Sequence, residues 1–260
     1  MPGPTVSATT TYEARVVGHL DDHWATWLDD LTLTRHDDGT TVLTGPIGDQ
    51  SELHGLLARI RDLGAPLLAL RTLNIPSAVL RHPVVTERLT LRPGSEHDAD
   101  ATFTYRRLAS VGEWLTELPP DLDSYRSSFA EPERIAATVI VELDGRVIGD
   151  LMLRVEDAWA QAEVADHAKR TMAELGWVLD PAHTGHGYAT EAVRALIEYC
   201  FTDLGLRRVV ASCFLADDAS ARLMERVGMR REGHAVAESL HRSGQWLDTV
   251  TYGVLAEDWP

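Results

Sequence analysis

The chain has few cysteines and no long apolar segment. Only two cysteines, Cys200 and Cys213, occur among its 260 residues, which excludes the disulfide frameworks of small secreted proteins and predicts reduced, packed thiols. There is no apolar run of the roughly 18 residues that a membrane-spanning helix needs. Residues 1–10 lack the basic and apolar regions of a signal peptide. We therefore expect a cytoplasmic protein without a membrane partner.

Positive charge is also scarce. The sequence has 24 Lys and Arg residues against 40 Asp and Glu residues, a formal net charge of −16. Such a surface repels the phosphates of nucleic acids, so we expect no nucleic-acid partner. It suits a cationic amine substrate, although an acidic surface also arises simply because it keeps a protein in solution.

The length and composition fit one large domain or two ordinary ones. A chain of 260 residues with 44% hydrophobic residues is long enough to bury a sizeable core. Pro76 and Pro83 mark residues 73–85 as a linker. We therefore expect a small domain over residues 1–72 and a larger one over residues 86–260.

Residues 12–72 carry a βαββαβ pattern. The expected elements are a strand from 12 to 16, a helix from 24 to 31, a hairpin turn at 37–40, a helix from 53 to 63 with Asp49 as its N-cap, and a strand from 66 to 70. This order predicts a small ferredoxin-like domain with two helices on one face of an antiparallel sheet.

No catalytic constellation occurs in this first part. Its histidines, His19, His23, His36 and His54, lack the spacing of metal ligands, and we expect no metal. A binding, regulatory or dimerising role is left for this domain, and a homodimer is one assembly consistent with it.

Residues 176–192 are the most informative part of the chain. A predicted strand runs through a glycine-rich turn into a helix, which apolar periodicity places at 188–204 with Gly205 as its C-cap. Unpaired amides and the helix dipole make such a turn an anion site, which Gly185 and Gly187 leave open to the ligand. The dinucleotide and P-loop signatures are absent. Taken alone, the glycine pair fits an ordinary strand-to-helix turn equally well.

A hairpin is predicted just upstream of this turn. The dipeptide Asp144-Gly145 joins strand-like runs at 137–143 and 146–155, and a third strand follows at 173–179. The glycine-rich turn therefore follows a sheet.

Several spaced blocks resemble the GNAT superfamily of N-acetyltransferases, and within it the RimJ/RimL type. The matching blocks are residues 86–92, 174–181, 184–189, 220–230 and 246–252. They span about residues 84–260 and imply a GNAT-type mixed central sheet flanked by helices, of the α+β or α/β class. The resemblance also implies direct acetyl transfer from acetyl-CoA to a primary amine, on a protein N-terminus or a small molecule, without a metal.

The resemblance places the cofactor along the strand and turn. Its pyrophosphate lies on the amides of residues 185–189, and its pantetheine arm pairs with the backbone of Trp177, Val178 and Leu179 as an added strand. A bulge in this strand would free an amide for the thioester carbonyl, a contact worth about 3 kcal/mol. The cofactor-binding residues predicted are Trp177, Val178, Leu179, Thr184, Gly185, His186, Gly187, Tyr188, Ala189, Thr190, Asp217 and Ser220.

Three positions depart from the family pattern. Thr184 replaces a Gln or Arg, which matters little because amides hold the phosphate. Asp217 replaces an Asn and cannot donate as an amide does; an N-cap role for a helix at 218–227 is the simpler interpretation. Met224 replaces the Tyr that protonates the departing thiolate in many relatives. Ser220 is our candidate acid instead, although a Ser at this position can also serve only its own helix.

A base is needed because only a neutral amine attacks. At pH 7, neutralising an α-amine with a pKa near 8 costs about 1.4 kcal/mol, whereas a lysine amine with a pKa near 10.4 costs about 4.6 kcal/mol. Weak base assistance therefore favours α-amines. Glu174 and Glu238 are the candidate bases, directly or through a water, and each could equally be a solvated surface acid.

Other expectations concern the surroundings of this site. We expect the acceptor pocket to use residues 114–120, Tyr125, residues 156–169 and residues 234–246. Cys213 precedes Ser220 closely and is a candidate for a mixed disulfide with CoA under oxidation. The rival interpretation is a non-catalytic acyl-CoA sensor, which would keep the phosphate turn and lack the usual Tyr and Asn.

Overall fold

The structure, a computed structural model, describes residues 10–21, 31–36, 38–47, 50–73 and 78–260. The chain divides into two compact units, Met1–Ile75 and Pro76–Pro260. Within the described residues, no helix is long and apolar enough to cross a membrane.

The first unit contains a four-stranded sheet and one described helix. Its elements are β1 (Thr10–Val17), β2 (Thr32–Arg35), β3 (Thr40–Ile47), α1 (Gln50–Asp62) and β4 (Leu67–Leu73). The strand order is β2-β3-β1-β4, and every neighbouring pair is antiparallel. This is the order that the predicted ferredoxin-like arrangement requires. Residues 24–30 of the expected first helix, and Asp49, the expected N-cap of the second helix, lie outside the described residues.

The core of this unit lies between α1 and one face of the sheet. Leu56 and Ile60 of α1 pack against Ala14, Val16 and Leu43 of the strands, and all five are at most 5% exposed. Apolar residues recur at helical spacing in α1 and at every second position in the strands. Each element therefore buries one apolar face.

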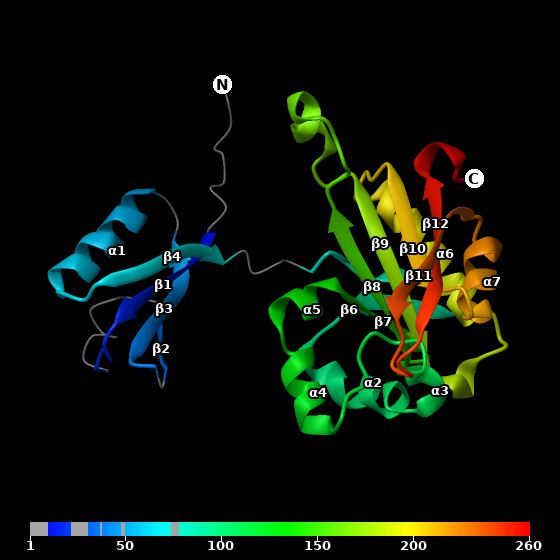
Figure 1. Cartoon of the computed structure of the whole chain (residues 1–260), viewed down its shortest axis with the longest axis horizontal. Coiled ribbons are helices and arrows are strands. Elements are labelled where there is room, and N and C mark those ends of the chain that lie inside the picture. The colour runs from blue at the N-terminus through cyan, green and yellow to red at the C-terminus, as the bar shows by residue number, and fades with distance from the viewer. Residues whose placement is uncertain (1–9, 22–30, 37, 48–49, 74–77) are drawn as a thin grey trace. The chain divides into compact units, whose positions relative to one another are not determined.

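The second unit is built on an eight-stranded mixed sheet (Figure 1). Its strands are β5 (Val84–Val85), β6 (Leu89–Pro93), β7 (Thr138–Leu143), β8 (Arg146–Glu156), β9 (Met172–Leu179), β10 (Arg208–Phe214), β11 (Arg230–Leu240) and β12 (Trp246–Leu255). Its helices are α2 (Ala99–Arg106), α3 (Ala109–Gly112), α4 (Leu122–Phe129), α5 (Pro132–Ala137), α6 (Tyr188–Thr202) and α7 (Asp218–Arg226), with short 3-10 turns between them. The order is β11-β12-β10-β9-β8-β7-β6-β5, and only β9 and β10 are parallel neighbours.

Helices cover both faces of this sheet. Helices α6 and α7 cover the face with the main core, where Leu196 and Ile197 of α6 are fully buried against Leu151, Leu153 and Val209. Helix α2 lies on the opposite face, anchored to β8. Leu80, which is 1% exposed, also belongs to the main core, so the second unit begins before residue 86, the expected start of the larger domain.

The predicted hairpin upstream of the glycine-rich turn is confirmed. Strands β7 and β8 pair antiparallel across Asp144 and Gly145, whose φ angles are 50° and 73°. Two positive φ angles match the twist of the flanking strands, and Asp-Gly is a pair that tolerates them.

Strands β9 and β10 separate toward their carboxyl ends. They pair only from Met172 to Glu174 on β9 and from Arg208 to Val210 on β10. Strand β9 stays paired with β8 without a register shift over its whole length. The bulge considered for β9 is therefore absent, and the free edge arises because β10 diverges.

Candidate active site

Two glycines shape the turn between β9 and α6. Gly185 and Gly187 have φ angles of 81° and 82°, in the left-handed region that other residues rarely adopt. The hydroxyl of Thr184 donates to the carbonyl of Pro181 at 2.9 Å, and Nδ1 of His186 lies 2.9 Å from the carbonyl of Thr184. These short contacts hold the turn in one shape, while residues 184–187 stay exposed to solvent.

The first turn of α6 leaves its amides available. Gly187 is the N-cap, and its carbonyl accepts from the amide of Glu191 at 3.0 Å. The amides of Tyr188, Ala189 and Thr190 precede this first helical bond, and a glycine cap has no side chain to bind them. Together with the helix dipole they form a site for an anion.

A salt bridge between Arg88, just before β6, and Glu191 of α6 braces this turn. The side chain of Arg88 lies 2.6 Å from Glu191 of α6 and donates to the carbonyl of His186 at 3.0 Å. Thr86 also donates to Glu191, at 2.6 Å. Burial opposes ionisation of Glu191, but the hydrogen bonds from Thr86 and Arg88 outweigh it and lower the pKa. Arg88 thus fixes the turn, and Glu191 balances its charge.

Further cationic and aromatic groups surround the same turn. The Arg88 guanidinium lies 4.6 Å from the ring centre of Tyr188, and the His186 ring stacks on Tyr188 with centroids 5.6 Å apart. Nε of Arg226, the last residue of α7, lies 3.4 Å from the hydroxyl oxygen of Thr190. Since no carboxylate among the described residues pairs with it, Arg226 keeps its charge available to an anion.

The free edge of β9 presents alternate peptide groups. The amide of Asp180 donates to a β8 carbonyl at 2.8 Å, whereas the carbonyl of Thr171 accepts from the residue before β10 at 2.9 Å. Because peptide groups alternate along a strand, those of Trp177 and Leu179 face the opening between β9 and β10. The peptide groups of Val178 face β8, unlike the arrangement predicted for all three residues.

The start of α7 lies beside this opening. Asp217 accepts from the amide of Ser220 at 3.1 Å, which confirms the predicted N-cap. The indole Nε1 of Trp177 donates to Oγ of Ser220 at 3.3 Å. Met224 is completely buried and, as a thioether, has no proton to donate.

The two candidate bases lie on the α2 side of the sheet, well apart. Glu174 is half-buried on β9, with its carboxylate 3.4 Å from Arg154. Glu238 lies in a bulge of β11 between residues 235 and 239 and accepts from the hydroxyl of Thr249. Strands β9 and β11 are three strand spacings apart, about 14 Å in a regular sheet. The two carboxylates therefore cannot both contact one amine.

An aromatic cluster lies where β10 ends. The ring of Phe214 is 5.8 Å from that of Trp114 and 5.6 Å from that of His241, and Trp114 and His241 are 5.7 Å apart. Nε2 of His241, near the tip of the β11–β12 hairpin, lies 2.9 Å from the carbonyl of Glu113. This contact brings the hairpin and the segment after α3 together, which are two of the regions expected at the acceptor pocket.

Another expected acceptor segment lies elsewhere. Residues 156–169 follow β8 and precede β9, at the end of β9 opposite the glycine-rich turn (Figure 1). The length of β9 separates them from the turn by about 24 Å at 3.4 Å per residue. The segment therefore lies away from the glycine-rich turn, and its contribution to the acceptor pocket stays a prediction.

Tyr125 does not line the acceptor pocket. It is 1% exposed, its ring packs 5.5 Å from that of Phe103 and 5.6 Å from that of Phe129, and its hydroxyl lies 3.0 Å from that of Thr102. Tyr125 is part of the small core between α2 and α4. Its phenol needed a polar partner inside that core, and Thr102 provides one.

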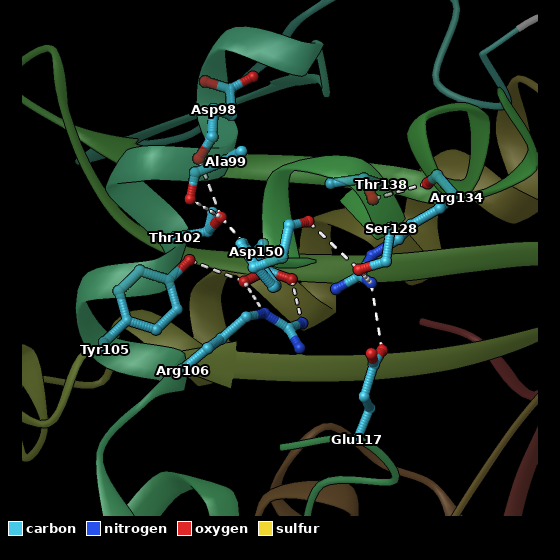
Figure 2. Close-up of polar contacts among 11 residues, drawn as sticks. Asp98, Ala99, Thr102, Tyr105, Arg106, Glu117, Ser128, Arg134, Thr138 and Asp150 are labelled. Atoms are coloured by element: carbon cyan, nitrogen blue, oxygen red, sulfur yellow. Dashed lines mark hydrogen bonds and ion pairs between the residues drawn. The ribbon is translucent and has the colours of Figure 1, made fainter. Parts of the chain in front are cut away.

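A buried carboxylate anchors α2 to the sheet (Figure 2). Asp150 of β8 is 4% exposed and accepts from the Tyr105 hydroxyl at 2.7 Å and from Arg106 Nε and Nη2 at 3.0 and 2.5 Å. Burial and the Asp150 charge raise the pKa of Tyr105, so the phenol remains a donor. A buried charge is tolerated only with such partners. The triad fixes the end of α2, from which the chain continues to Trp114.

Cys213 lies near the end of β10, close to the start of α7. Its side chain is half-buried, and its Sγ lies 4.0 Å from the carbonyl of Asp217. Burial, and then the charge of Asp217, raise the pKa of this thiol to about 11. The thiol is therefore almost wholly protonated at neutral pH, and its mixed disulfide with CoA stays a prediction.

Sequence reasoning missed the roles of Arg88, Arg226 and the aromatic cluster. The partners of Arg88 are 98 and 103 residues away in the sequence, and the aromatic partners of Trp114 are about as far. No local sequence pattern therefore predicts these contacts. The block at residues 86–92 carries the family resemblance but gives Arg88 no role. In the structure Arg88 precedes β6 and faces the glycine-rich turn.

Comparisons with known families cover both units. Residues 88–230 match the family described as acetyltransferase (GNAT) domain. Residues 11–71 match a domain of unknown function (DUF8691).

Individual relatives are also named as N-acetyltransferases. The chain is 29% identical over 177 residues to the uncharacterized N-acetyltransferase YnaD of Bacillus subtilis, covering 68% of this chain and 98% of YnaD. It is 31% identical over 85 residues to the ribosomal protein uS5-alanine N-acetyltransferase of Escherichia coli, covering 33% and 43%. The structure of Mycobacterium smegmatis RimJ in complex with CoA-disulfide is similar, with 25% identity, a TM-score of 0.54, and coverage of 66% of this chain and 84% of that one.

Proposed function

Because the chain belongs to the GNAT family of acetyltransferases, we propose that it transfers the acetyl group of acetyl-CoA directly to an α-amine. The observation that carries this proposal is the glycine-rich turn with its free amides, next to the separated ends of β9 and β10. An N-acetyltransferase of this family takes its acetyl group from the thioester of acetyl-CoA.

The residues present fit such a cofactor. A Cβ built on Gly185 would meet nothing within 4 Å, and one on Gly187 would meet only the end of Arg88 at 3.6 Å. The turn therefore leaves room for a diphosphate against the amides of residues 187–190. The peptide groups of Trp177 and Leu179 supply an unpaired strand edge for the pantetheine amides.

Two side chains are assigned to the chemistry. Glu174 takes the proton that the amine loses as its nitrogen bonds to the acetyl carbon, acting through a water because its carboxylate lies along β9 from Trp177. The carbon–sulfur bond breaks, the sulfur keeps the electron pair, and the hydroxyl of Ser220 donates a hydrogen bond to it. Glu238, at the far side of β10 and β12, is the second choice for the base.

An α-amine suits this arrangement better than a lysine amine. A single half-buried carboxylate assists weakly, and the free energy needed to neutralise an α-amine at pH 7 is about 3 kcal/mol smaller. The Escherichia coli relative is named for its action on an alanine of ribosomal protein uS5, which supports a peptide N-terminus as the acceptor. A ribosomal acceptor would also place the reaction in the cytoplasm. A small-molecule amine is the alternative acceptor.

A thiol-release assay with acetyl-CoA tests this function. We expect turnover with peptides that carry a free N-terminus, and much less with the same peptides blocked at the N-terminus and carrying a free lysine. Mass spectrometry of the products locates the acetyl group. Faster turnover of the lysine peptides would overturn the α-amine assignment. Tight binding of CoA without turnover of any amine would instead favour the acyl-CoA sensor.

The choice between the two bases is tested by Glu174→Gln and Glu238→Gln. Loss of the base should lower kcat at neutral pH and shift the pH profile upward, because the amine must then lose its proton to bulk solvent. We expect this for Glu174→Gln. The same change in Glu238→Gln alone would reverse the assignment.

A further inference from the structure

We propose that the indole N–H of Trp177 orients the hydroxyl of Ser220 so that its proton points at the cofactor sulfur. Trp177 is thereby a positioning residue, in addition to presenting its backbone to the pantetheine arm. The inference deepens the proposed function, because it rests on Ser220 as the donor to the sulfur.

The direction of one hydrogen bond carries this argument. Nε1 of Trp177 lies 3.3 Å from Oγ of Ser220. An indole nitrogen is only a donor, whereas a hydroxyl can both donate and accept. Ser220 must therefore accept in this contact, and its own proton is left for another partner.

The local backbone does not take up that proton. A serine in the first turn of a helix commonly bonds a nearby carbonyl, yet no described residue accepts from the Ser220 hydroxyl, and only the Ser220 amide is bound, by Asp217. The N-cap carboxylate is thus occupied by the backbone. Helix capping and the indole together leave the hydroxyl free to donate.

The position of Trp177 sets where the proton can go. Its peptide groups line the opening between β9 and β10, while its side chain turns toward the α6 face and packs against the main core. Ser220 meets that side chain from the start of α7. A pantetheine arm that pairs with the Trp177 backbone would therefore pass within the length of one side chain of the Ser220 hydroxyl.

The two residues also compensate for a missing acid. Met224 replaces the tyrosine found in many relatives, and it is fully buried. A lone serine hydroxyl rotates freely and spends part of its time donating elsewhere. Fixing its acceptor side makes it a better oriented donor, which is how preorganised groups stabilise developing charge.

The decisive measurement is the pKa of the CoA thiol in the enzyme–CoA product complex. Thiolate formation is followed by ultraviolet absorbance against pH, with the desulfo-CoA complex as the blank so that Cys200 and Cys213 cancel. A donated hydrogen bond stabilises the thiolate, so we expect the wild-type complex to titrate about one pH unit below free CoA. Trp177→Phe keeps a ring and removes the N–H, and it should return most of that shift.

A double-mutant cycle on kcat provides the second readout. Trp177→Phe and Ser220→Ala should each lower kcat about tenfold, with little change in the Kd of CoA. The double variant should be no slower than Ser220→Ala alone, because the indole acts only through the hydroxyl. Trp259→Phe is the matched control: its ring also packs on α6, 5.8 Å from Phe201, away from the opening, and it should leave kcat unchanged.

The outcomes distinguish a failure of the positioning role of Trp177 from a failure of the role of Ser220 as donor. If Ser220→Ala lowers kcat and raises the bound thiol pKa while Trp177→Phe behaves as the wild type, the positioning role is overturned and the proposed function stands. If Ser220→Ala also behaves as the wild type, Ser220 loses its role as donor. If Trp177→Phe slows the Ser220→Ala enzyme further, the indole acts by another route and the inference is overturned.

Discussion

Cys200 and Cys213 differ in what surrounds their sulfur atoms. Cys200 is completely buried in the main core, where burial alone raises its pKa to about 12. Cys213 is half-buried near the start of α7, and its pKa is raised to about 11 by burial and then by Asp217. Since the thiolate is the reactive form, proximity to the cofactor does not by itself make Cys213 reactive.

The predicted mixed disulfide of Cys213 with CoA should therefore depend steeply on pH. With CoA disulfide as the oxidant, the Cys213 thiolate attacks one sulfur and free CoA leaves. A raised pKa leaves little thiolate at neutral pH, so the rate should rise about tenfold per pH unit below pH 11. Intact-protein mass spectrometry at pH 7, 8 and 9 follows the adduct. Cys213→Ser should give none, and a rate that does not change with pH would contradict the assignment of the raised pKa.

At the scale of an element, α6 depends on a glycine at its N-cap. Gly187 has a φ of 82°, so Gly187→Val both strains the backbone by about 1–2 kcal/mol and puts a branched side chain at the anion site. We expect the Kd of CoA, measured by calorimetry, to rise at least tenfold. Gly205→Ala is the control, because Gly205 has a φ of 64° near the other end of α6. It should lower the melting temperature without changing the Kd.

The end of α7 should also contribute to cofactor affinity. Arg226 reaches Thr190 in the first turn of α6 at 3.4 Å, so its charge lies near the anion site in a protein of net charge −16. Arg226→Gln should raise the Kd of CoA several-fold and weaken its salt dependence. Arg222→Gln, on the same helix but already paired with Asp218 at 3.6 Å, should change neither. Equal effects of both substitutions would show that only overall charge matters.

Sequence predicted those elements whose signals are local. The turn with Gly185 and Gly187, the Asp144-Gly145 hairpin and the Asp217 cap each rest on residues within a few positions of one another, and the structure has all three. Glycines and caps fix backbone geometry through their own chemistry, so an isolated sequence reveals them.

Features that depend on packing between distant segments could not be predicted. Tyr125 belongs to a core that forms only when α2 and α4 meet, and nothing near it in the sequence distinguishes a buried phenol from a pocket residue. We considered a bulge in β9 and did not predict that β10 diverges from it. Strand pairing depends on the whole sheet, so a single strand's sequence does not reveal it. The distance between Glu174 and Glu238 likewise follows from the strand order.

For the whole molecule, each of the two units has a main hydrophobic core of its own among the described residues. One lies between α1 and the four-stranded sheet, and the other lies between α6, α7 and the eight-stranded sheet. The turn, the free edge of β9 and Ser220 all belong to the unit Pro76–Pro260, which contains its own complete sheet. Each part is large enough to bury a core of its own.

Residues 76–260 should therefore fold and bind CoA without the first unit. We expect the shortened chain to melt cooperatively and to bind CoA with a Kd within about threefold of the full chain, because the cofactor site that we propose uses only residues from Thr86 onward. Comparing kcat/KM of both chains on N-terminal peptides then isolates the contribution of the DUF8691 match at residues 11–71. An unchanged Kd with a lower kcat/KM would assign the first unit to acceptor recognition. Loss of CoA binding by a folded shortened chain would contradict the independence of the site.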